Sequence, residues 1–317
     1  MLLITTEDLT SDQLAKLTTM TSADLPVEHI TEDLASQTSL LPQVRIWITY
    51  GHDVTPELIA KMPNLIWVQI FQAGVEHLPF DELHDRNIQV TNMKGIQSIP
   101  MAEYTLSMMF HFNGNITRYQ TYQNENHWET EAVFQELHGQ TVTIMGAGTI
   151  GIEIAAKCKA LNMTVYGVNT TGHMKPPFDY MYKLEDRCDA LQLSDYVILL
   201  MPVTESTTHC MSDKEYHSMK PSAFLINLGR GPLIDDHALL QAIDDHEIAG
   251  AALDVFDQEP LPSSHPFWNH DKIIVTPHVA AKSPQYMDRC LDKFAENYHA
   301  FMQNDHLLYL VDLTKGY

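Results

Sequence analysis

Three residues of the chain, Arg230, Glu259 and His278, could together do acid–base chemistry on a molecule that carries a carboxylate. An arginine guanidinium holds a carboxylate through two parallel hydrogen bonds. A histidine gives or takes a proton near neutral pH, and a carboxylate bonded to it fixes its tautomer. Taken singly, each residue has a simpler explanation: a surface turn, a loop charge and a hydrogen-bonded structural histidine.

The segments before these residues predict that they meet. Apolar runs at 223–228, 248–255 and 273–276 are typical of buried strands, and each run leads to one of the three side chains. The carboxyl ends of parallel strands lie at one edge of a sheet. We therefore expect Arg230, Glu259 and His278 to converge at that edge.

A glycine turn lies between two further predicted strands. Gly146, Gly148 and Gly151 follow the apolar run 142–145 with the spacing G-x-G-x-x-G, and a helical pattern and a β-branched run at 164–168 come next. In this context the turn predicts dinucleotide binding: the glycines allow the tight turn, the approach of a pyrophosphate and close helix packing. The helix N–H groups would face the phosphates. The alternative is a glycine-rich turn in another kind of α/β protein.

The first 96 residues are expected to form another α/β unit. Short apolar runs at 2–4, 44–48, 65–71 and 88–90 alternate with helix-compatible segments, which favours a parallel sheet covered on both faces. Two of its strands end in the glycine-containing segments 49–51 and 72–75. Such loops can offer backbone N–H groups to an anion, although an ordinary strand-to-helix turn explains them equally well.

Two long helices are predicted outside these runs. The segment from Ser98 to Tyr119 is methionine-rich and apolar almost all round, which indicates burial in an interface or in a core. The segment 121–138 is polar, contains Trp128 and is expected to be an extended connection. A last amphipathic helix begins near Ser283 and has no strand to extend the second sheet, so we expect it to return to the first unit.

Composition narrows the classes of partner. A length of 317 residues suits two domains, and a formal net charge of −22 argues against binding to nucleic acid or to anionic membrane surfaces. No signal peptide or membrane-spanning run is recognisable, and four scattered cysteines suit a reducing cytoplasmic location. The seventeen histidines form no metal-binding motif, so no metal is expected.

Taken together, the motifs resemble those of the D-isomer-specific 2-hydroxyacid dehydrogenases. The similarity runs nearly end to end, through segments 73–78, 101–104, 146–151, 201–207, 227–231, 253–262, 276–278 and 311–313. The resemblance implies two doubly wound parallel-sheet α/β domains. A Rossmann cofactor domain at 99–281 would be inserted into a discontinuous flavodoxin-like substrate domain made of 1–98 and 282–317. A homodimer, formed through the helix that begins near Pro100, is also implied.

The resemblance assigns expected roles to individual residues. Arg230 would bind the substrate carboxylate and polarise the keto oxygen, and His278 would be the acid or base, in contact with substrate and cofactor. Glu259 would be its partner, and Ala73 and Gly74 would offer N–H groups to the substrate. The other expected cofactor contacts are Gly146, Gly148, Thr149, Ile150, Gly151, Asn169, Thr170, Met201, Pro202, Thr207, Leu228, Gly229 and Asp254, with Thr207 near the pyrophosphate and Asp254 at the nicotinamide carboxamide.

The sequence differs from the NAD-type pattern at Asn169, which ends the second cofactor strand where an acid is usual. An acid there bonds the ribose hydroxyls and repels a 2′-phosphate. Thr170 and Thr171 can donate hydrogen bonds, and His173 and Lys175 can bring positive charge nearby. The prediction is therefore that NADP is preferred, with an NAD enzyme that carries a substituted acid as the alternative.

The predicted function is reversible reduction of a small 2-keto acid to the D-2-hydroxy acid by hydride from NAD(P)H. A dinucleotide-sensing scaffold or corepressor on the same fold is the alternative from another class. The substrate side chain stays open. Residues that could line its pocket are Tyr50, Phe71, Gln72, Trp268 and Tyr286.

Overall fold

The computed structural model describes residues 1–6, 9–21, 25–31, 34–75, 77–131 and 133–314. Glu76, which belongs to the 73–78 motif, lies outside the described residues. The chain forms two compact units. Unit 1 contains Met1–Ile96 and Ser283–Tyr317, and unit 2 contains Gln97–Lys282.

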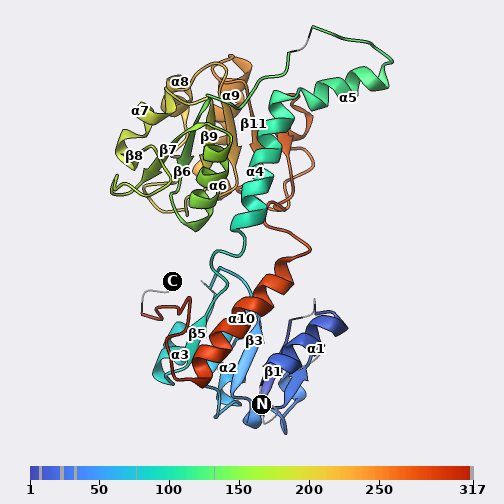
Figure 1. Ribbon diagram of the computed structural model, residues 1–317, viewed down its shortest axis with the longest axis vertical. Helices are drawn as coiled ribbons and strands as arrows, with labels where there is room; N and C mark the ends of the chain where they lie inside the picture. The colour runs from blue at the N-terminus through green and yellow to red at the C-terminus, as the bar shows by residue number, and fades with distance from the viewer. Residues whose placement is uncertain (7–8, 22–24, 32–33, 76, 132, 315–317) are drawn as a thin grey trace. The chain divides into compact units, whose positions relative to one another are not determined.

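Unit 1 is built on a parallel sheet with the strand order β2-β1-β3-β4-β5 (Figure 1). The strands are β1 (Leu2–Ile4), β2 (Val27–His29), β3 (Ile46–Thr49), β4 (Trp67–Ile70) and β5 (Gln89–Thr91). The helices are α1 (Ser11–Met20), α2 (Pro56–Ala60), α3 (Phe80–Asp85) and α10 (Tyr286–Met302), with 3-10 turns η1 (Leu34–Ser36) and η2 (Leu41–Gln43). This strand order is that of flavodoxin-like folds.

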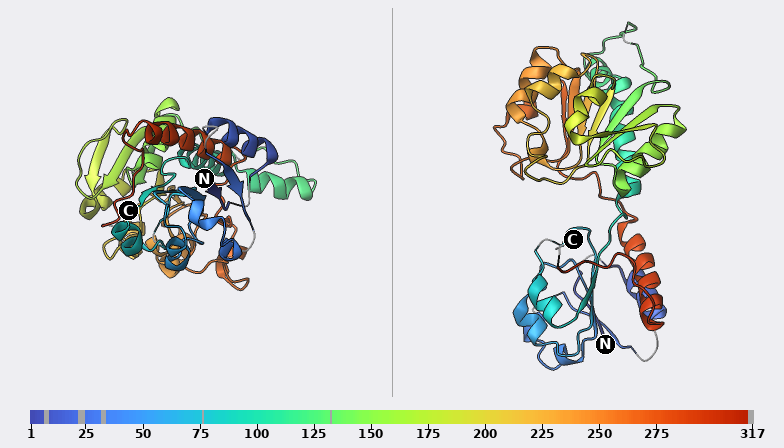
Figure 2. Two further views of the ribbon diagram at one scale, coloured as in Figure 1. Left: turned by 90° about the horizontal axis from the view of Figure 1, so that it is seen from below. Right: turned by 90° about the vertical axis from the view of Figure 1, so that its left-hand side faces the viewer.

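Alternating side chains of these strands fill two cores. Leu3, Trp47 and Val68 face α2 and α3, whereas Ile48 and Trp67 face α1 and α10. Figure 2 shows α1 and α10 together on one side of the sheet. Helix α10 buries residues at spacings of three and four, which are Met287, Cys290, Leu291, Phe294 and Tyr298. The sheet is therefore covered on both faces, as parallel sheets require.

Unit 2 is built on a parallel sheet with the order β12-β11-β10-β9-β6-β7-β8. The strands are β6 (Thr141–Met145), β7 (Thr164–Asn169), β8 (Tyr180–Lys183), β9 (Tyr196–Leu199), β10 (Phe224–Asn227), β11 (Gly250–Leu253) and β12 (Ile273–Val275). The helices are α4 (Ser98–Asn113), α5 (Ile116–Asn124), α6 (Thr149–Ala160), α7 (Arg187–Leu191), α8 (Asp213–Ser218) and α9 (Asp236–Asp244). Short 3-10 turns are η3 (Leu184–Asp186), η4 (Gly231–Leu233) and η5 (Pro266–Asn269).

The strand order of unit 2 reverses between β6 and β9. Crossovers run outward from this point in both directions, which leaves a crevice at the carboxyl ends of the two strands in a Rossmann sheet. Helices α4 and α6 cover one face and α7, α8 and α9 the other. The predicted fold class, α/β with two doubly wound parallel sheets, is confirmed.

Two predicted segments are corrected. The helix expected from Ser98 to Tyr119 is interrupted, because Gly114 caps α4 and Asn115 adopts a left-handed backbone with φ 50°. Gly114 keeps a right-handed backbone, so the left-handed conformation that ends many helices is taken by Asn115. The chain then continues as α5 to Asn124, so the first part of the predicted extended connection is helical. Strands β2 and β8 were not predicted, since each is short and has exposed or half-buried positions.

Candidate active site

The loops after β10, β11 and β12 carry Arg230, Glu259 and His278. The ring Nδ1 of His278 lies 2.8 Å from Oε2 of Glu259. The other carboxylate oxygen of Glu259 accepts a hydrogen bond of 3.0 Å from the backbone N–H of Phe256. One oxygen of the Glu259 carboxylate is thus held by the backbone of its own loop. The other oxygen orients the imidazole of His278, which follows the next strand.

Arg230 lies beside this pair because the loops after β10 and β11 pack tightly. A side chain at Gly231 would place its Cβ only 2.0 Å from the carbonyl carbon of Phe256, so only glycine fits there. The amide of Asn227 holds the backbone carbonyl of Arg230 at 3.0 Å. The guanidinium is exposed, and its Nη1 donates to the carbonyl of Gly229 at 2.7 Å. It keeps further N–H donors for a carboxylate.

The electrostatics of Glu259 tie the three residues together. Partial burial by itself raises the pKa of its carboxyl. The hydrogen bonds from His278 and Phe256 and the positive charges of His278 and Arg230 outweigh burial, so the pKa lies below its ordinary value. Glu259 is consequently a carboxylate at neutral pH and can hold the Nδ1 proton of His278. The Nε2 atom of His278 is then the position for proton exchange.

The glycine turn between β6 and α6 has the geometry of a phosphate site. Gly146 has φ +119°, which only glycine adopts readily, and a Cβ at Gly151 would lie 2.2 Å from the carbonyl oxygen of Gly146. At Gly148, by contrast, a Cβ would meet no atom within 4 Å. Gly148 is also the N-cap of α6 and makes no side-chain cap, so N–H groups of the first turn point to this open space.

Comparisons with known proteins agree with these features. The model of the D-isomer specific 2-hydroxyacid dehydrogenase NAD binding domain matches residues 106–280, more than half of the chain. The chain belongs to the D-isomer-specific 2-hydroxyacid dehydrogenase family. It is an NAD(P)-dependent 2-hydroxyacid dehydrogenase, and the residues of the glycine turn fit the nicotinamide dinucleotide that such enzymes use.

Relatives within this dehydrogenase family extend the match. A glyoxylate reductase of Thermofilum pendens is 29% identical over 259 residues, which cover 80% of this chain and 76% of the relative. The crystal structure of a family protein of Aeromonas salmonicida is 30% identical, with a TM-score of 0.83 and 98% of each chain covered. A family dehydrogenase of Xanthobacter autotrophicus, solved with NADPH and MES, is 25% identical to this chain, with a TM-score of 0.79. The match covers 100% of this chain and 99% of the relative.

The other residues expected at the cofactor lie in unit 2 of the dehydrogenase. Thr149 and Ile150 start α6 directly after the glycine turn. Met201 and Pro202 follow β9, and Leu228 and Gly229 follow β10. Thr207 is buried, and its hydroxyl organises the loop after β9: it donates to the carbonyl of Pro202 and accepts the N–H of Thr204, both at 2.7 Å. Their contacts with the dinucleotide stay predictions.

Asp254 has a different environment from the one expected for a cofactor ligand. It is 2% exposed, and its carboxylate accepts hydrogen bonds from the loop that carries His278. The expected contact with the nicotinamide carboxamide therefore stays a prediction, and the structure adds a second role at this position.

The loop after β7 is held by Asn169. Its side-chain oxygen accepts the N–H groups of Thr171 at 2.9 Å and Gly172 at 2.6 Å, and so closes the turn that exposes Thr170 and Thr171. Lys175, further along the loop, reaches back to the glycine turn, where its Nζ lies 3.1 Å from the carbonyl oxygen of Ala147. The loop thus places a cation beside the glycine turn. The sequence raised Lys175 as a nearby charge but did not fix its position.

The residues predicted to hold the substrate from the first unit lie after β4. Asn92 donates to the carbonyl of Ala73 at 2.9 Å, and Met93 donates to that of Gln72 at 3.0 Å, so this loop is tied to the end of β5. Phe71 is fully buried, and its place in the substrate pocket stays a prediction. Tyr286 is also engaged, since its hydroxyl donates to the carbonyl of Phe71 at 2.8 Å.

The described residues also bear on metal ions, membranes and disulfides. No group of three or more His, Cys, Asp or Glu side chains there is arranged to hold a metal ion. No described helix combines the length and the apolar character that a membrane crossing needs. The four cysteines, all described, form no disulfide.

Proposed function

We propose that this dehydrogenase reduces a small 2-keto acid to the D-2-hydroxy acid and prefers NADPH as the reductant. The adjacent placement of Arg230, Glu259 and His278 beyond one edge of the unit 2 sheet carries the proposal. Relatives named glyoxylate reductases support a small keto acid as the substrate class. No observation on the described residues favours the alternative of a dinucleotide-sensing scaffold.

The residues divide the chemistry among them. The bound dinucleotide supplies hydride to the keto carbon. Arg230 binds the carboxylate through its guanidinium fork and stabilises negative charge as it develops on the keto oxygen. His278 donates the proton from Nε2 to that oxygen, because Glu259 keeps Nδ1 protonated and holds the ring in place. In the reverse direction His278 accepts the proton from the hydroxyl.

Turnover of a panel of 2-keto acids tests the proposal. Oxidation of NADPH and NADH is followed at the nicotinamide absorbance with glyoxylate, hydroxypyruvate, pyruvate, and branched and aromatic keto acids. We expect turnover of at least one small keto acid and loss of it in Arg230→Ala and His278→Ala. The product is assigned by chiral chromatography. No turnover with any acid and either cofactor would favour the scaffold alternative.

The cofactor preference rests on charge at the end of β7. Asn169 lacks the negative charge that would repel a 2′-phosphate, and its side-chain oxygen is occupied by the loop N–H groups. Lys175 lies on the same loop as Asn169 and supplies a positive charge that a 2′-phosphate bound at this loop can pair with. The Xanthobacter autotrophicus dehydrogenase, which is similar to this chain, was solved with NADPH. These observations favour NADPH, while the alternative of an NAD enzyme with a substituted acid stays open to experiment.

Matched lysine variants test this preference. Lys175→Gln should lower kcat/KM for NADPH by about 10-fold and change that for NADH less, because only NADPH carries a 2′-phosphate that the ammonium can pair with. A tenfold change corresponds to about 1.4 kcal/mol. Lys157→Gln, on the same unit and paired with Glu153 at the far end of α6, should leave the ratio unchanged. The preference fails if NADH has the higher kcat/KM and Asn169→Asp leaves the NADPH value unaffected.

We also propose that the enzyme is a homodimer. Helix α5 and the loop after it extend away from the seven-stranded sheet (Figures 1 and 2). This arm and the neighbouring face of α4 expose large apolar side chains, namely Ile99, Phe110, Ile116, Tyr119, Trp128, Val133 and Phe134. Trp128 is 91% exposed. An exposed apolar surface of this kind, shared by α4, α5 and the following loop, is typical of an interface. A second copy of the chain is the proposed occupant.

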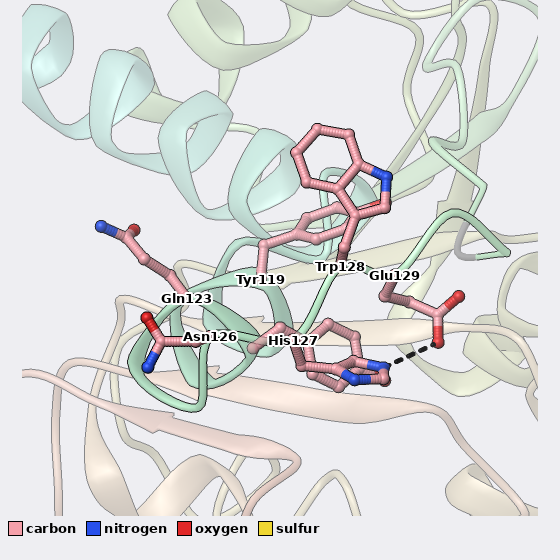
Figure 3. A pocket seen from close by; sticks show the side chains of 7 residues that line it. Tyr119, Gln123, Asn126, His127, Trp128 and Glu129 are labelled. Carbon is pink, nitrogen blue, oxygen red and sulfur yellow. Dashed lines mark ion pairs between the residues drawn. The ribbon is translucent and has the colours of Figure 1, made fainter.

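The arm also holds a pocket of about 440 Å³ (Figure 3). It is lined by Tyr119, Tyr122, Gln123, Asn126, His127, Trp128 and Glu129. The His127 ring lies 5.0 Å from the Tyr122 ring, tilted by 60° to it, and its Nε2 lies 3.7 Å from Oε2 of Glu129. A side chain of the second copy would fill this pocket. Sedimentation velocity tests the proposal: Trp128→Glu should give a monomer, whereas Tyr180→Glu, at an exposed tyrosine on β8, should remain dimeric.

Unit 1 is the proposed substrate domain. The Ala73–Gly74 loop, tied down by Asn92, would offer its N–H groups to the substrate carboxylate. Gly74→Pro, which removes one donor, should raise KM for the keto acid more than KM for the cofactor. A cytoplasmic location stays a prediction of the sequence.

A further inference from the structure

A chain of hydrogen bonds connects helix α4 to the loop that carries His278. The hydroxyl of Tyr104 donates to Oγ1 of Thr276 at 2.5 Å, and Thr276 donates to Oδ1 of Asp254 at 2.7 Å. The single hydroxyl proton of Thr276 is donated in the hydrogen bond to Asp254. The oxygen of Thr276 must therefore accept the hydrogen bond from Tyr104. The direction of the chain is therefore fixed from Tyr104 through Thr276 to Asp254.

Asp254 in turn holds the backbone on the far side of His278. Its carboxylate oxygens accept the N–H groups of Val279 and Ala280, each at 2.9 Å, and its backbone carbonyl accepts the N–H of His278, also at 2.9 Å. A carboxylate that is 2% exposed is costly without such partners, so these bonds hold the loop firmly.

The backbone at His278 needs this support. His278 has φ +52°, in the left-handed region that is uncommon for residues other than glycine and costs free energy. Three successive N–H groups bound to one residue keep the loop in this conformation. The ring can then stay at 2.8 Å from Glu259, with its other nitrogen free for the substrate.

Tyr104 is suited to be the fixed end of this chain. It lies on α4, whose apolar side packs with α6 in the core of unit 2. Partial burial raises the pKa of the Tyr104 hydroxyl, and the hydrogen bond to Thr276 lowers it. The negative charge of Asp254 raises the pKa further, so it lies above its ordinary value. The hydroxyl thus keeps its proton and its role as donor.

We propose that Tyr104 and Thr276 are positioning residues, which act through Asp254 to set the orientation of the His278 imidazole. This inference rests on the proposed role of His278 as the proton donor. Neither Tyr104 nor Thr276 was assigned a role from the sequence, since a tyrosine on an apolar helix is first explained by packing.

Single substitutions separate positioning from folding. Thr276→Val keeps the shape but breaks both bonds, and Tyr104→Phe breaks one. We expect kcat to fall about 10-fold in the first and about 3-fold in the second, because small displacements of a catalytic group cost rate steeply. The dissociation constant of NADPH, measured by fluorescence, should stay within twofold. Thr276→Ser should restore kcat.

The matched control is Tyr196→Phe. Tyr196 is a buried residue of unit 2, and its hydroxyl bonds a residue of α4, namely Asn113 at the opposite end of that helix from Tyr104. This variant removes a comparable hydrogen bond away from His278, so its Tm should fall while kcat stays within twofold. An equal fall of kcat in Tyr196→Phe and Tyr104→Phe would overturn the inference.

A second readout does not depend on turnover. The rate at which diethylpyrocarbonate modifies His278, mapped by mass spectrometry against the exposed His237, should change at least threefold in Thr276→Val and not in Tyr196→Phe. Unchanged modification together with unchanged kcat would refute the positioning role. If the wild-type enzyme turns over no keto acid, the proposed function fails by itself, and the modification rates alone decide the inference.

Discussion

Two glycines of the same turn are expected to respond in opposite ways to one added methyl group. At Gly148 the Cβ of an alanine would meet no protein atom within 4 Å, and φ −83° is allowed for alanine. Alanine is a poorer N-cap residue than glycine, which lowers the free energy of unfolding by about 0.5–1 kcal/mol. Alanine also restricts the unfolded chain, which raises the free energy of unfolding by about 0.4–1 kcal/mol. Gly148→Ala should therefore keep a Tm close to that of the wild type.

The same methyl group should hinder the cofactor. It projects into the open space where the pyrophosphate is expected to approach the backbone, so the phosphate must move outward and its bonds to the N–H groups of α6 lengthen. We expect the dissociation constant of NADPH to rise about 10-fold or more, which is about 1.4 kcal/mol or more. Fluorescence titration of NADPH measures this change.

Gly151→Ala is the contrasting variant. Its Cβ would lie 2.2 Å from the carbonyl oxygen of Gly146, whereas ordinary contacts begin at 3.4 Å, so the helix must move away from the turn. Overpacking of this kind costs about 1–3 kcal/mol, and the higher helix propensity of alanine returns about 1 kcal/mol. Both Tm and NADPH affinity should fall. An NADPH dissociation constant within twofold of wild type in Gly148→Ala would refute the assignment of this turn to the pyrophosphate.

Three further predictions concern other parts of the molecule. Arg230→Lys keeps the charge but loses the fork, so kcat/KM for the keto acid should fall about 100-fold, or about 3 kcal/mol, and a change below threefold would remove Arg230 from carboxylate binding. The pKa of Glu259 is lowered in the folded enzyme, so its stabilising contribution is present above the ordinary value of 4.5 and is lost as the pH falls through the lower folded value. The difference in Tm between wild type and Glu259→Gln should accordingly shrink from pH 5 toward pH 3, and a constant difference would contradict this reasoning. Burial raises the pKa of Cys158 to about 12, of Cys210 to about 11 and of Cys290 to about 12, so at pH 8 these thiols should react with a disulfide reagent only after denaturation, as peptide mapping can check.

Much of the fold could be predicted because it depends on local patterns. The glycine spacing, the helix after it and the buried strands on either side are all fixed by residues close in sequence. A parallel sheet then requires that strand ends share one edge, and this requirement was enough to predict that Arg230, Glu259 and His278 lie near one another. The break between α4 and α5 was missed because one glycine and one asparagine outweighed a continuous apolar pattern.

The tertiary structure decided the contacts between residues that are far apart in the chain. The 2.8 Å bond from His278 to Glu259, the reach of Lys175 back to Ala147 and the chain from Tyr104 to Asp254 each depend on how loops pack, and no spacing rule specifies them. The same holds for Asp254, whose carboxylate holds the His278 loop. Sequence alone determined which residue types follow the ends of the strands, because hydrophobic period and turn residues are local signals. Only the folded loops determine which atoms meet, because hydrogen bonds depend on distances of tenths of an ångström.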